Sequence, residues 1–307
     1  MRSGKGAFGG WRLAGAGLLA ATVLAVSACG GATGGSGSGG GGGSDSTAAG
    51  GLTELGKKLP QSIQDSKEIK VGSDIAYAPV EFMEGDEAVG IDPDLAAELG
   101  KKLGVKFTFS NSTFDNLIPS LKAKRFDIIM SAMSATEERA KEISFVTYFT
   151  VGTSIVVKKG NPEGIQSLDD LCGKTVSVQD ATTQEDVALG QQKKCKAQGK
   201  DLKILTPKTD PEALLDIKSG RAVADMNDFP VAAYNAKTAG GGNDFEVVGE
   251  QIDAGPYGIG VRKEDAQLRD ALNEALKASI ADGTYQQVLQ KWNVAQGAVT
   301  APEVMGA

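Results

Sequence analysis

The chain has 307 residues, 41% of them hydrophobic, and a formal net charge of −7. This length and apolar share suffice for a buried core in one or two domains. The acidic balance and the lack of a long basic run exclude a typical nucleic-acid-binding protein, since phosphate binding needs clustered lysine and arginine. The sequence contains no histidine, which excludes an imidazole base and a histidine-ligated metal site.

The first residues have the features of an export signal. A basic segment, residues 2–12, precedes an almost wholly apolar or small stretch, residues 13–26. This stretch is too short to span a bilayer comfortably and fits a signal peptide over residues 1–28. It ends in Val-Ser-Ala-Cys29, which resembles the lipobox of bacterial lipoproteins. We therefore expect acyl chains such as palmitate on Cys29; the alternative is an ordinary cleaved signal with an incidental cysteine.

A glycine- and serine-rich segment follows the leader. Residues 30–51 cannot bury enough apolar surface to offset their entropy, so we expect a flexible linker over residues 29–65. Its root-mean-square reach is roughly 30 Å. No second hydrophobic span follows in the sequence. The expected location is therefore the outer face of the bacterial cell membrane, with the protein held there by lipid.

The body of the chain alternates strand-like and helix-like segments. One helix begins near Asp92, which can cap it, and Pro93, which suits its first position. Leucines recur along this helix at spacing four, and Gly104 ends it. In chain order we expect strands over 68–73, 105–109 and 126–130 and helices over 92–103 and 116–124.

A second unit with the same alternation begins near Val156. Asp210 and Pro211 repeat the cap-and-proline start, and Gly220 closes that helix. The alternation predicts parallel strands with helices on both faces, in two α/β lobes. The expected elements are strands 176–178, 222–226 and 257–261 and helices 185–195, 210–219, 264–281 and 285–292.

The three cysteines are not equivalent. Export makes a disulfide between Cys172 and Cys195 chemically possible. Closing a loop of that length stabilises a fold by about 3 kcal/mol in the chain-entropy model. Two free buried thiols are the alternative.

Six segments, in this order and spacing, resemble the family 3 extracellular solute-binding proteins, which are polar amino-acid receptors of ABC importers. Three residues depart from the family pattern. Val80 stands where Phe is usual, Pro93 interrupts the helix signature, and Ala181 stands where Gly is usual. The segments are VGSDIAYAPVEF (71–82), GIDPDLAAELGKKLGV (90–105), FDNLIPSLKAKRFDIIMSAMSATEER (114–139), VSVQDATTQE (176–185), SGRAVADMNDFPVAAY (219–234) and YGIGVRKED (257–265).

The resemblance implies a periplasmic-binding-protein-like fold of two α/β lobes, joined by a two-strand hinge, with the ligand in the cleft. Lobe 1 is then expected over 66–153 and 256–296, lobe 2 over 154–255, and a C-terminal tail over 297–307. The implied function is to capture a free amino acid by hinge closure and deliver it to a permease with cytoplasmic ATPase subunits. A monomer without cofactor or metal is expected.

The resemblance also assigns the groups that hold the ligand's carboxylate. Arg139 follows a buried strand, and its guanidinium offers two parallel N–H bonds to a carboxylate. Without the resemblance, an arginine in this Glu-rich turn reads as a solvated surface charge. Ser134 and the backbone N–H of Thr183 complete the expected carboxylate site.

For the ligand's ammonium group, the expected partners are Asp228, Ser134 and the carbonyl of Ala132. Asp228 also fits a turn or cap residue. The expected side-chain contacts are Asp74, Tyr77, Phe114, Gln179 and Asn227. Ordinary core packing is the alternative for the two aromatic residues.

An inward Asp74 favours a cationic or amide side chain over an acidic one. A polar or basic ligand is therefore expected, and glutamine, arginine, lysine and histidine remain open.

Two other functions fit the same fold. A periplasmic dehydratase would need an acid or base in the cleft, and a carboxylate such as Asp74 could serve. A detached sensory receptor would hand its signal to a separate membrane protein. Turnover of a bound compound would favour the enzyme.

Overall fold

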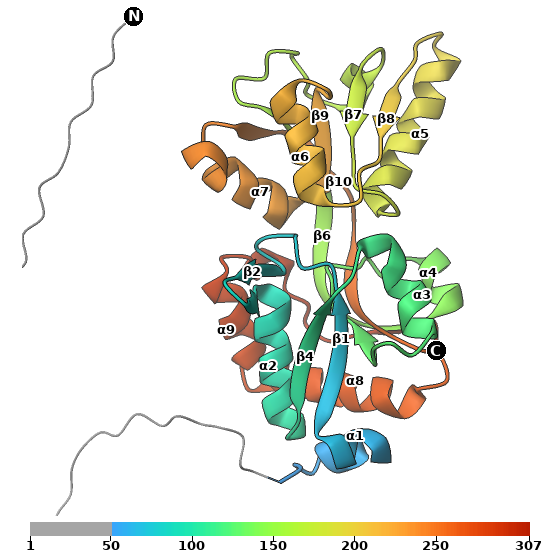
Figure 1. The fold of residues 1–307 in the computed structure, drawn as a ribbon, viewed down its shortest axis with the longest axis vertical. Coiled ribbons are helices and arrows are strands. Elements are labelled where there is room, and N and C mark those ends of the chain that lie inside the picture. The colour runs from blue at the N-terminus through green and yellow to red at the C-terminus, as the bar shows by residue number, and fades with distance from the viewer. Residues whose placement is uncertain (1–50) are drawn as a thin grey trace, which may run out of the picture. The chain divides into compact units, whose positions relative to one another are not determined.

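The computed structural model describes residues 51–307, which fold as two α/β lobes connected by two long strands (Figure 1). The predicted fold class is confirmed. The predicted signal peptide, Cys29 and most of the predicted linker lie outside the described residues.

Lobe 1 is built on a parallel core with β1 at its centre. Strand β1 pairs in parallel with β4 on one side and with β5 on the other, as the strand–helix alternation predicted. The strands are β1 (Glu68–Ser73), β2 (Phe82–Glu84), β3 (Glu87–Val89), β4 (Lys106–Asn111) and β5 (Ile128–Ile129), and the helices are α1 (Gln61–Ser66), α2 (Ile91–Leu103), α3 (Leu117–Lys122), α4 (Glu137–Glu142), α8 (Ala266–Ala281) and α9 (Thr284–Lys291).

Lobe 2 has its own hydrophobic core, which includes Val176, Val178 and Met226. Strand β7 pairs in parallel with both β8 and β9. The predicted disulfide is present, with 5.3 Å between the Cα atoms of Cys172 and Cys195. The elements are β7 (Thr175–Ser177), β8 (Lys203–Leu205), β9 (Ala224–Asp228), α5 (Thr183–Ala197), α6 (Asp210–Ser219) and α7 (Phe229–Thr238).

Two strands run through both lobes, β6 (Ser144–Lys158) and β10 (Phe245–Val261). They pair with each other in antiparallel fashion, and β6 also pairs antiparallel with β9. The β6–β10 register shifts between Val248 and Gly255, so the ladder is interrupted where the chain passes between the lobes. The predicted lobe boundaries, at 153/154 and 255/256, fall in this stretch and stay predictions.

Asp92 does not cap α2 as predicted. Gly90, with φ of 135°, is the cap residue, and a Cβ at Gly90 would lie 2.2 Å from the carbonyl oxygen of Val80. Asp92 is instead in the first turn and fully buried. Gly104 ends the helix with φ of 71°, as predicted, because glycine adopts the left-handed conformation without steric cost.

Regular structure begins before residue 65, the predicted end of the linker. Residues 56–58 form a 3₁₀ helix and residues 61–66 form α1. Leu59 and Ile63 are buried in the core of lobe 1, and this apolar contact provides the stabilisation that the preceding Gly/Ser-rich composition lacks.

The predicted C-terminal tail, residues 297–307, also contacts the folded part of the chain through hydrogen bonds to β6. Strand β11 (Val304–Met305) pairs with β6, and the hydroxyl of Ser144 donates to the carbonyl of Gly306. Further 3₁₀ turns cover Phe114–Asn116, Leu168–Leu171, Ala239–Gly241 and Ala295–Gly297.

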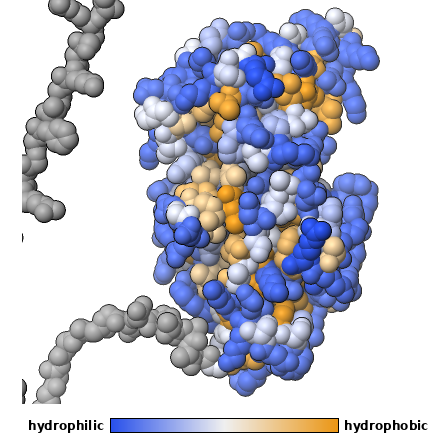
Figure 2. Space-filling model, viewed as in Figure 1, coloured by the Kyte–Doolittle hydropathy of each residue, from blue (hydrophilic) through white to orange (hydrophobic). Residues whose placement is uncertain are grey.

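The face of the folded region in Figure 2 is mostly hydrophilic, with hydrophobic residues in scattered patches. Within residues 51–307, no helix combines the length and the apolar character needed to cross a membrane.

Candidate ligand-binding site

A small cavity lies between the lobes. Its walls come from the segments that follow β1, β4, β5 and β7 and from the end of β9. The carboxyl ends of parallel strands are where open α/β sheets bind ligands. Lobe 1 contributes Asp74, Tyr77, Glu81, Phe114, Ser131, Ala132, Ser134 and Arg139, and lobe 2 contributes Gln179, Thr182, Thr183, Gln184 and Asp228.

Arg139 lies on α4, whose first turn is capped by the hydroxyl of Thr136. Its Nη1 donates to the carbonyl of Ser134 at 2.9 Å, and its Nη2 donates to the carbonyl of Ala181 at 3.0 Å. The guanidinium also lies 5.3 Å from the centre of the Phe114 ring. Because these contacts use two of its five N–H groups, the guanidinium is oriented in the cavity wall with donors left for an anion.

Asp228 ends β9 and is 5% exposed. Its Oδ1 accepts from Nε2 of Gln184 at 2.8 Å, and its Oδ2 accepts from the hydroxyl of Tyr77 at 3.2 Å. Burial raises the pKa of Asp228 to about 6, while hydrogen bonds such as those from Tyr77 and Gln184 and the charge of Arg139 oppose that rise. The carboxylate is thus ionised at neutral pH and available to a cation.

Asp74 forms the acidic end of the cavity. It is 6% exposed, and its Oδ2 accepts from Nε2 of Gln179 at 2.6 Å. The same Nε2 donates to the carbonyl of Lys208 at 2.9 Å. Burial raises the pKa of Asp74, and the hydrogen bond from Gln179 partly offsets this effect.

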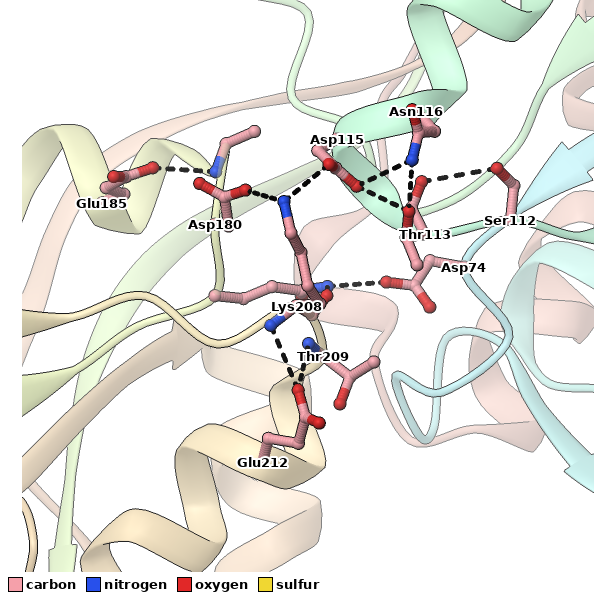
Figure 3. A network of polar contacts seen from close by, with 12 residues as sticks. Asp74, Ser112, Thr113, Asp115, Asn116, Asp180, Glu185, Lys208, Thr209 and Glu212 are labelled. Atoms are coloured by element: carbon pink, nitrogen blue, oxygen red, sulfur yellow. Dashed lines mark hydrogen bonds and ion pairs between the residues drawn. The ribbon is translucent and has the colours of Figure 1, made fainter.

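An ion-pair bridge connects the lobes beside Asp74, as Figure 3 shows. Nζ of Lys208 in lobe 2 lies 2.7 Å from Oδ2 of Asp115 in lobe 1 and 2.5 Å from Oδ2 of Asp180. The Gln179–Asp74 bond and this bridge therefore close the same side of the cleft.

All but one of the predicted ligand contacts are brought together at this cavity. The exception is Asn227, which does not line it. Its Nδ2 donates to Oδ2 of Asp225 at 2.8 Å. Side chains alternate between the faces of a strand, so Asn227 and Asp225 share the face of β9 opposite to Asp228.

The prediction missed four lining residues, Glu81, Ser131, Thr182 and Gln184. Gln184 could have been found, because it directly follows Thr183 at the start of α5 and reaches Asp228. Ala181 has a φ of 62°, a left-handed conformation that explains why glycine is usual there.

Residues 69–295 match the profile of the bacterial extracellular solute-binding proteins, family 3. The chain belongs to this family. It is 36% identical over 230 residues to the histidine-binding periplasmic protein of Escherichia coli (strain K12), an alignment that covers 73% of this chain and 86% of that protein.

Solved structures of similar sequence have the same fold. An ancestral arginine-binding protein bound to arginine has a TM-score of 0.69 and 37% identity, covering 74% of this chain and 98% of that one. An ancestral amino-acid-binding protein described as a precursor of cyclohexadienyl dehydratase has a TM-score of 0.68 and 39% identity, covering 75% and 97%. These similar proteins are named as binding proteins.

Among the described residues that line the cavity of this family 3 chain, Arg139 is the one cation, facing the three acids Asp74, Glu81 and Asp228. Residues 51–307 contain no group of three or more acidic or cysteine side chains arranged to hold a metal ion.

Proposed function

We propose that this family 3 protein is the receptor of an ABC importer for a free amino acid with a basic side chain. The observation that carries the proposal is the charge pattern of the cavity. Arg139 would bind the ligand's carboxylate, and Asp228 would bind its ammonium group. Asp74 is a further buried acid that would bind the positive charge of the ligand's side chain. The names of relatives that bind histidine or arginine agree with this class of ligand.

The two α-groups of the ligand would be held from different lobes. Arg139 lies in lobe 1 and supplies a rigid fork of donors, with the Ser134 hydroxyl and the Thr183 backbone N–H beside it. Asp228 lies in lobe 2 and supplies the anion, with the carbonyl of Ala132 opposite. A bound amino acid would then join the lobes, and its preference for the closed arrangement would shift the protein towards it.

The ligand's side chain would extend towards Asp74. Tyr77 and Phe114 provide aromatic walls for an apolar stem or a cationic head. Gln179 already donates to Asp74 at 2.6 Å, so it holds the carboxylate in place for a second donor. The Asn227 contact is dropped, because that side chain faces Asp225.

The role of the Asp74 charge is tested by measuring the affinities of wild type and one variant for two ligands. Wild-type protein should bind arginine much more tightly than citrulline, its uncharged analogue of the same shape. Asp74→Asn should weaken arginine binding by about tenfold or more, since a buried charged partner is lost, and should affect citrulline far less. Asp86→Asn, on the exposed turn between β2 and β3, is the control and should change neither affinity. Equal losses for both ligands would contradict the assignment.

Lipid attachment at Cys29 and export are part of the proposal, and they rest on the leader sequence. Cys29→Ser should release the protein from the membrane fraction of the producing bacterium, because the acyl chains that hold it there can no longer be attached. Retention of the variant in membranes would contradict it. Delivery to a permease is expected of the lipid-held, monomeric receptor.

We also propose binding without turnover. The cavity acids Asp74 and Asp228 are each engaged by protein donors at 2.6 to 3.2 Å, an arrangement suited to holding charge. Recovery of unchanged amino acid after long incubation is expected, whereas a dehydrated product would favour the enzyme alternative.

A further inference from the structure

Two buried carboxyl side chains meet beneath the lobe 1 side of the cavity. Glu81 is 1% exposed and Asp92 is fully buried. The backbone N–H of Asp92 donates to the carbonyl of Val80, the residue before Glu81, at 3.0 Å, and the charge of Asp92 acts on the Glu81 side chain. Glu81 follows the cis-proline turn after β1, while Asp92 is in the first turn of α2, so the pair joins two separate segments of the lobe.

Each acid is also bonded to the segment that forms the ligand site. Asp92 accepts from the backbone N–H of Ala132 at 3.2 Å, and from the hydroxyl of Tyr148 at 2.6 Å. Glu81 Oε1 accepts from the hydroxyl of Ser131 at 3.2 Å. That hydroxyl oxygen in turn accepts from the backbone N–H of Asp74 at 2.8 Å.

The Asp92–Ala132 bond holds an unusual backbone conformation. Ala132 has a φ of 45°, a left-handed conformation that costs free energy in a residue with a Cβ. Since the Ala132 carbonyl is a proposed ligand contact, the acceptor at Asp92 fixes the segment whose carbonyl must point into the cleft.

Two adjacent buried carboxylates cannot both carry a charge, and they hydrogen-bond only when one of them holds a proton. Oε2 of Glu81 is buried and has no hydrogen-bond partner in residues 51–307, so a proton on this oxygen, directed at the Asp92 carboxylate, would satisfy it. The charged groups that act on Glu81 are all acids, Asp92 from α2, Asp74 after β1 and Asp228 from β9, and the Tyr148 phenol faces it from β6.

We propose that Glu81 and Asp92 share one proton and that this carboxyl pair positions the lobe 1 part of the ligand site, Ala132 directly and Asp74 through Ser131. Glu81 donates its O–H to Asp92, so that Asp92 is the acceptor of three hydrogen bonds. The burial of Glu81, followed by the charge of Asp92, raises the pKa of Glu81 well above its usual range. Glu81 and Asp92 are positioning residues, and Asp74 remains the acid for the ligand's side chain.

Three variants test whether Glu81 is neutral or ionised in the folded protein. Glu81→Gln keeps one donor for Asp92 and one acceptor for Ser131, so arginine affinity should stay within about threefold of wild type. Glu81→Ala removes both contacts. In Asp92→Asn, either Ala132 N–H or the Tyr148 hydroxyl loses its acceptor. These two variants should weaken arginine binding by about tenfold or more. A loss in Glu81→Gln as large as in Glu81→Ala would overturn the proposal, because it would mean that the site needs the ionised acid.

Infrared spectroscopy of the full chain tests the proton without any ligand. At neutral pH, wild type minus Glu81→Gln should show one protonated carboxylic-acid C=O band. Asp216→Asn is the control, because Asp216 is a buried acid of lobe 2 that accepts from Ser177 and pairs with Arg221. Its difference spectrum should lack that band. Absence of the band in the Glu81 difference spectrum would refute the shared proton.

Only the affinity measurements rest on the proposed function. If wild-type protein binds no amino acid, the proposed function fails while the infrared result still decides the shared proton. If arginine binds and the band is absent, the function stands and this inference fails.

Discussion

Arg139 and Asp228 are 89 residues apart in the sequence, yet both line one cavity from opposite lobes. Arg139 is held by two carbonyl oxygens and by its position over Phe114. Asp228 is held by Tyr77 and Gln184. Pre-oriented charges of opposite sign suit a zwitterion, because little further ordering is needed when it binds.

Removing the guanidinium tests the carboxylate site. Arg139→Ala should weaken amino-acid binding by several kcal/mol, about 100-fold or more, since a desolvated carboxylate would lose its charged partner. Arg139→Lys should recover only part of this loss, because a lysine lacks the planar fork. Lys141→Ala, on the same helix with a side chain 70% exposed, is the control and should leave calorimetric affinity unchanged. Normal binding by Arg139→Ala would refute the assignment.

The pKa of Asp228 makes a prediction about pH. Its carboxylate must be ionised to hold the ligand's ammonium group, and its pKa in the described structure is about 6. Below that pH the free site protonates, so affinity should fall as pH decreases, by up to about tenfold per unit. Citrulline should show this fall as well, because it carries the same α-ammonium group. A flat affinity between pH 7 and pH 5 would contradict this role.

Most of the site's residues could be predicted from sequence because they follow strand ends in motifs with a fixed order. Asn227 does not line the cavity, since an extended strand sends neighbouring residues to opposite faces. Glu81 and Asp92 could not be assigned, because their roles depend on two segments meeting in space. The local signal at Asp92 indicated a helix cap, whereas tertiary contacts to Tyr148 and Ala132 bury it.

At the scale of elements, sequence patterns located the central helices and strands well. Strand β1 and the end of α2 at Gly104 lie where they were predicted. Of the long strands β6 and β10, only residues 257–261 at the end of β10 were predicted as a strand. Their middle parts cross between the lobes, and neither length nor periodicity indicates such a crossing. The short helices before β1 were missed because a few buried residues, not composition, stabilise them.

The disulfide of lobe 2 should affect stability and not ligand affinity. It joins Cys172, just after a 3₁₀ turn, to Cys195 on α5, 23 residues apart. Replacing both cysteines with alanine should lower the free energy of unfolding by about 3 kcal/mol. Neither cysteine lines the cavity, so arginine affinity should be unchanged. Denaturant unfolding and calorimetry measure the two effects, and a large loss of affinity with intact stability would contradict this separation.

At the scale of the whole folded region, the contacts between lobes set how readily the cleft stays closed. The Lys208 bridge joins Asp115 of lobe 1 to lobe 2. Because the Lys208 side chain is 56% exposed, its contribution is modest and sensitive to salt.

Lys208→Ala should therefore weaken ligand binding by about two- to fivefold, and less at high salt. Lys218→Ala is a matched control, since its side chain is 57% exposed and its ion pair with Asp244 at 2.7 Å lies within lobe 2. Equal effects of the two variants, measured as dissociation rates in parallel, would show that the bridge does not stabilise closure.

The central claim is that the cleft binds a free amino acid with a basic side chain. The most direct test is calorimetric titration of the full-length protein with each of the twenty common amino acids, after unfolding and refolding to remove carried-over ligand. We predict tight binding of one or more of arginine, lysine and histidine and no detectable binding of glutamate or aspartate. Tight binding of an acidic amino acid, or no binding of any amino acid, would contradict the claim.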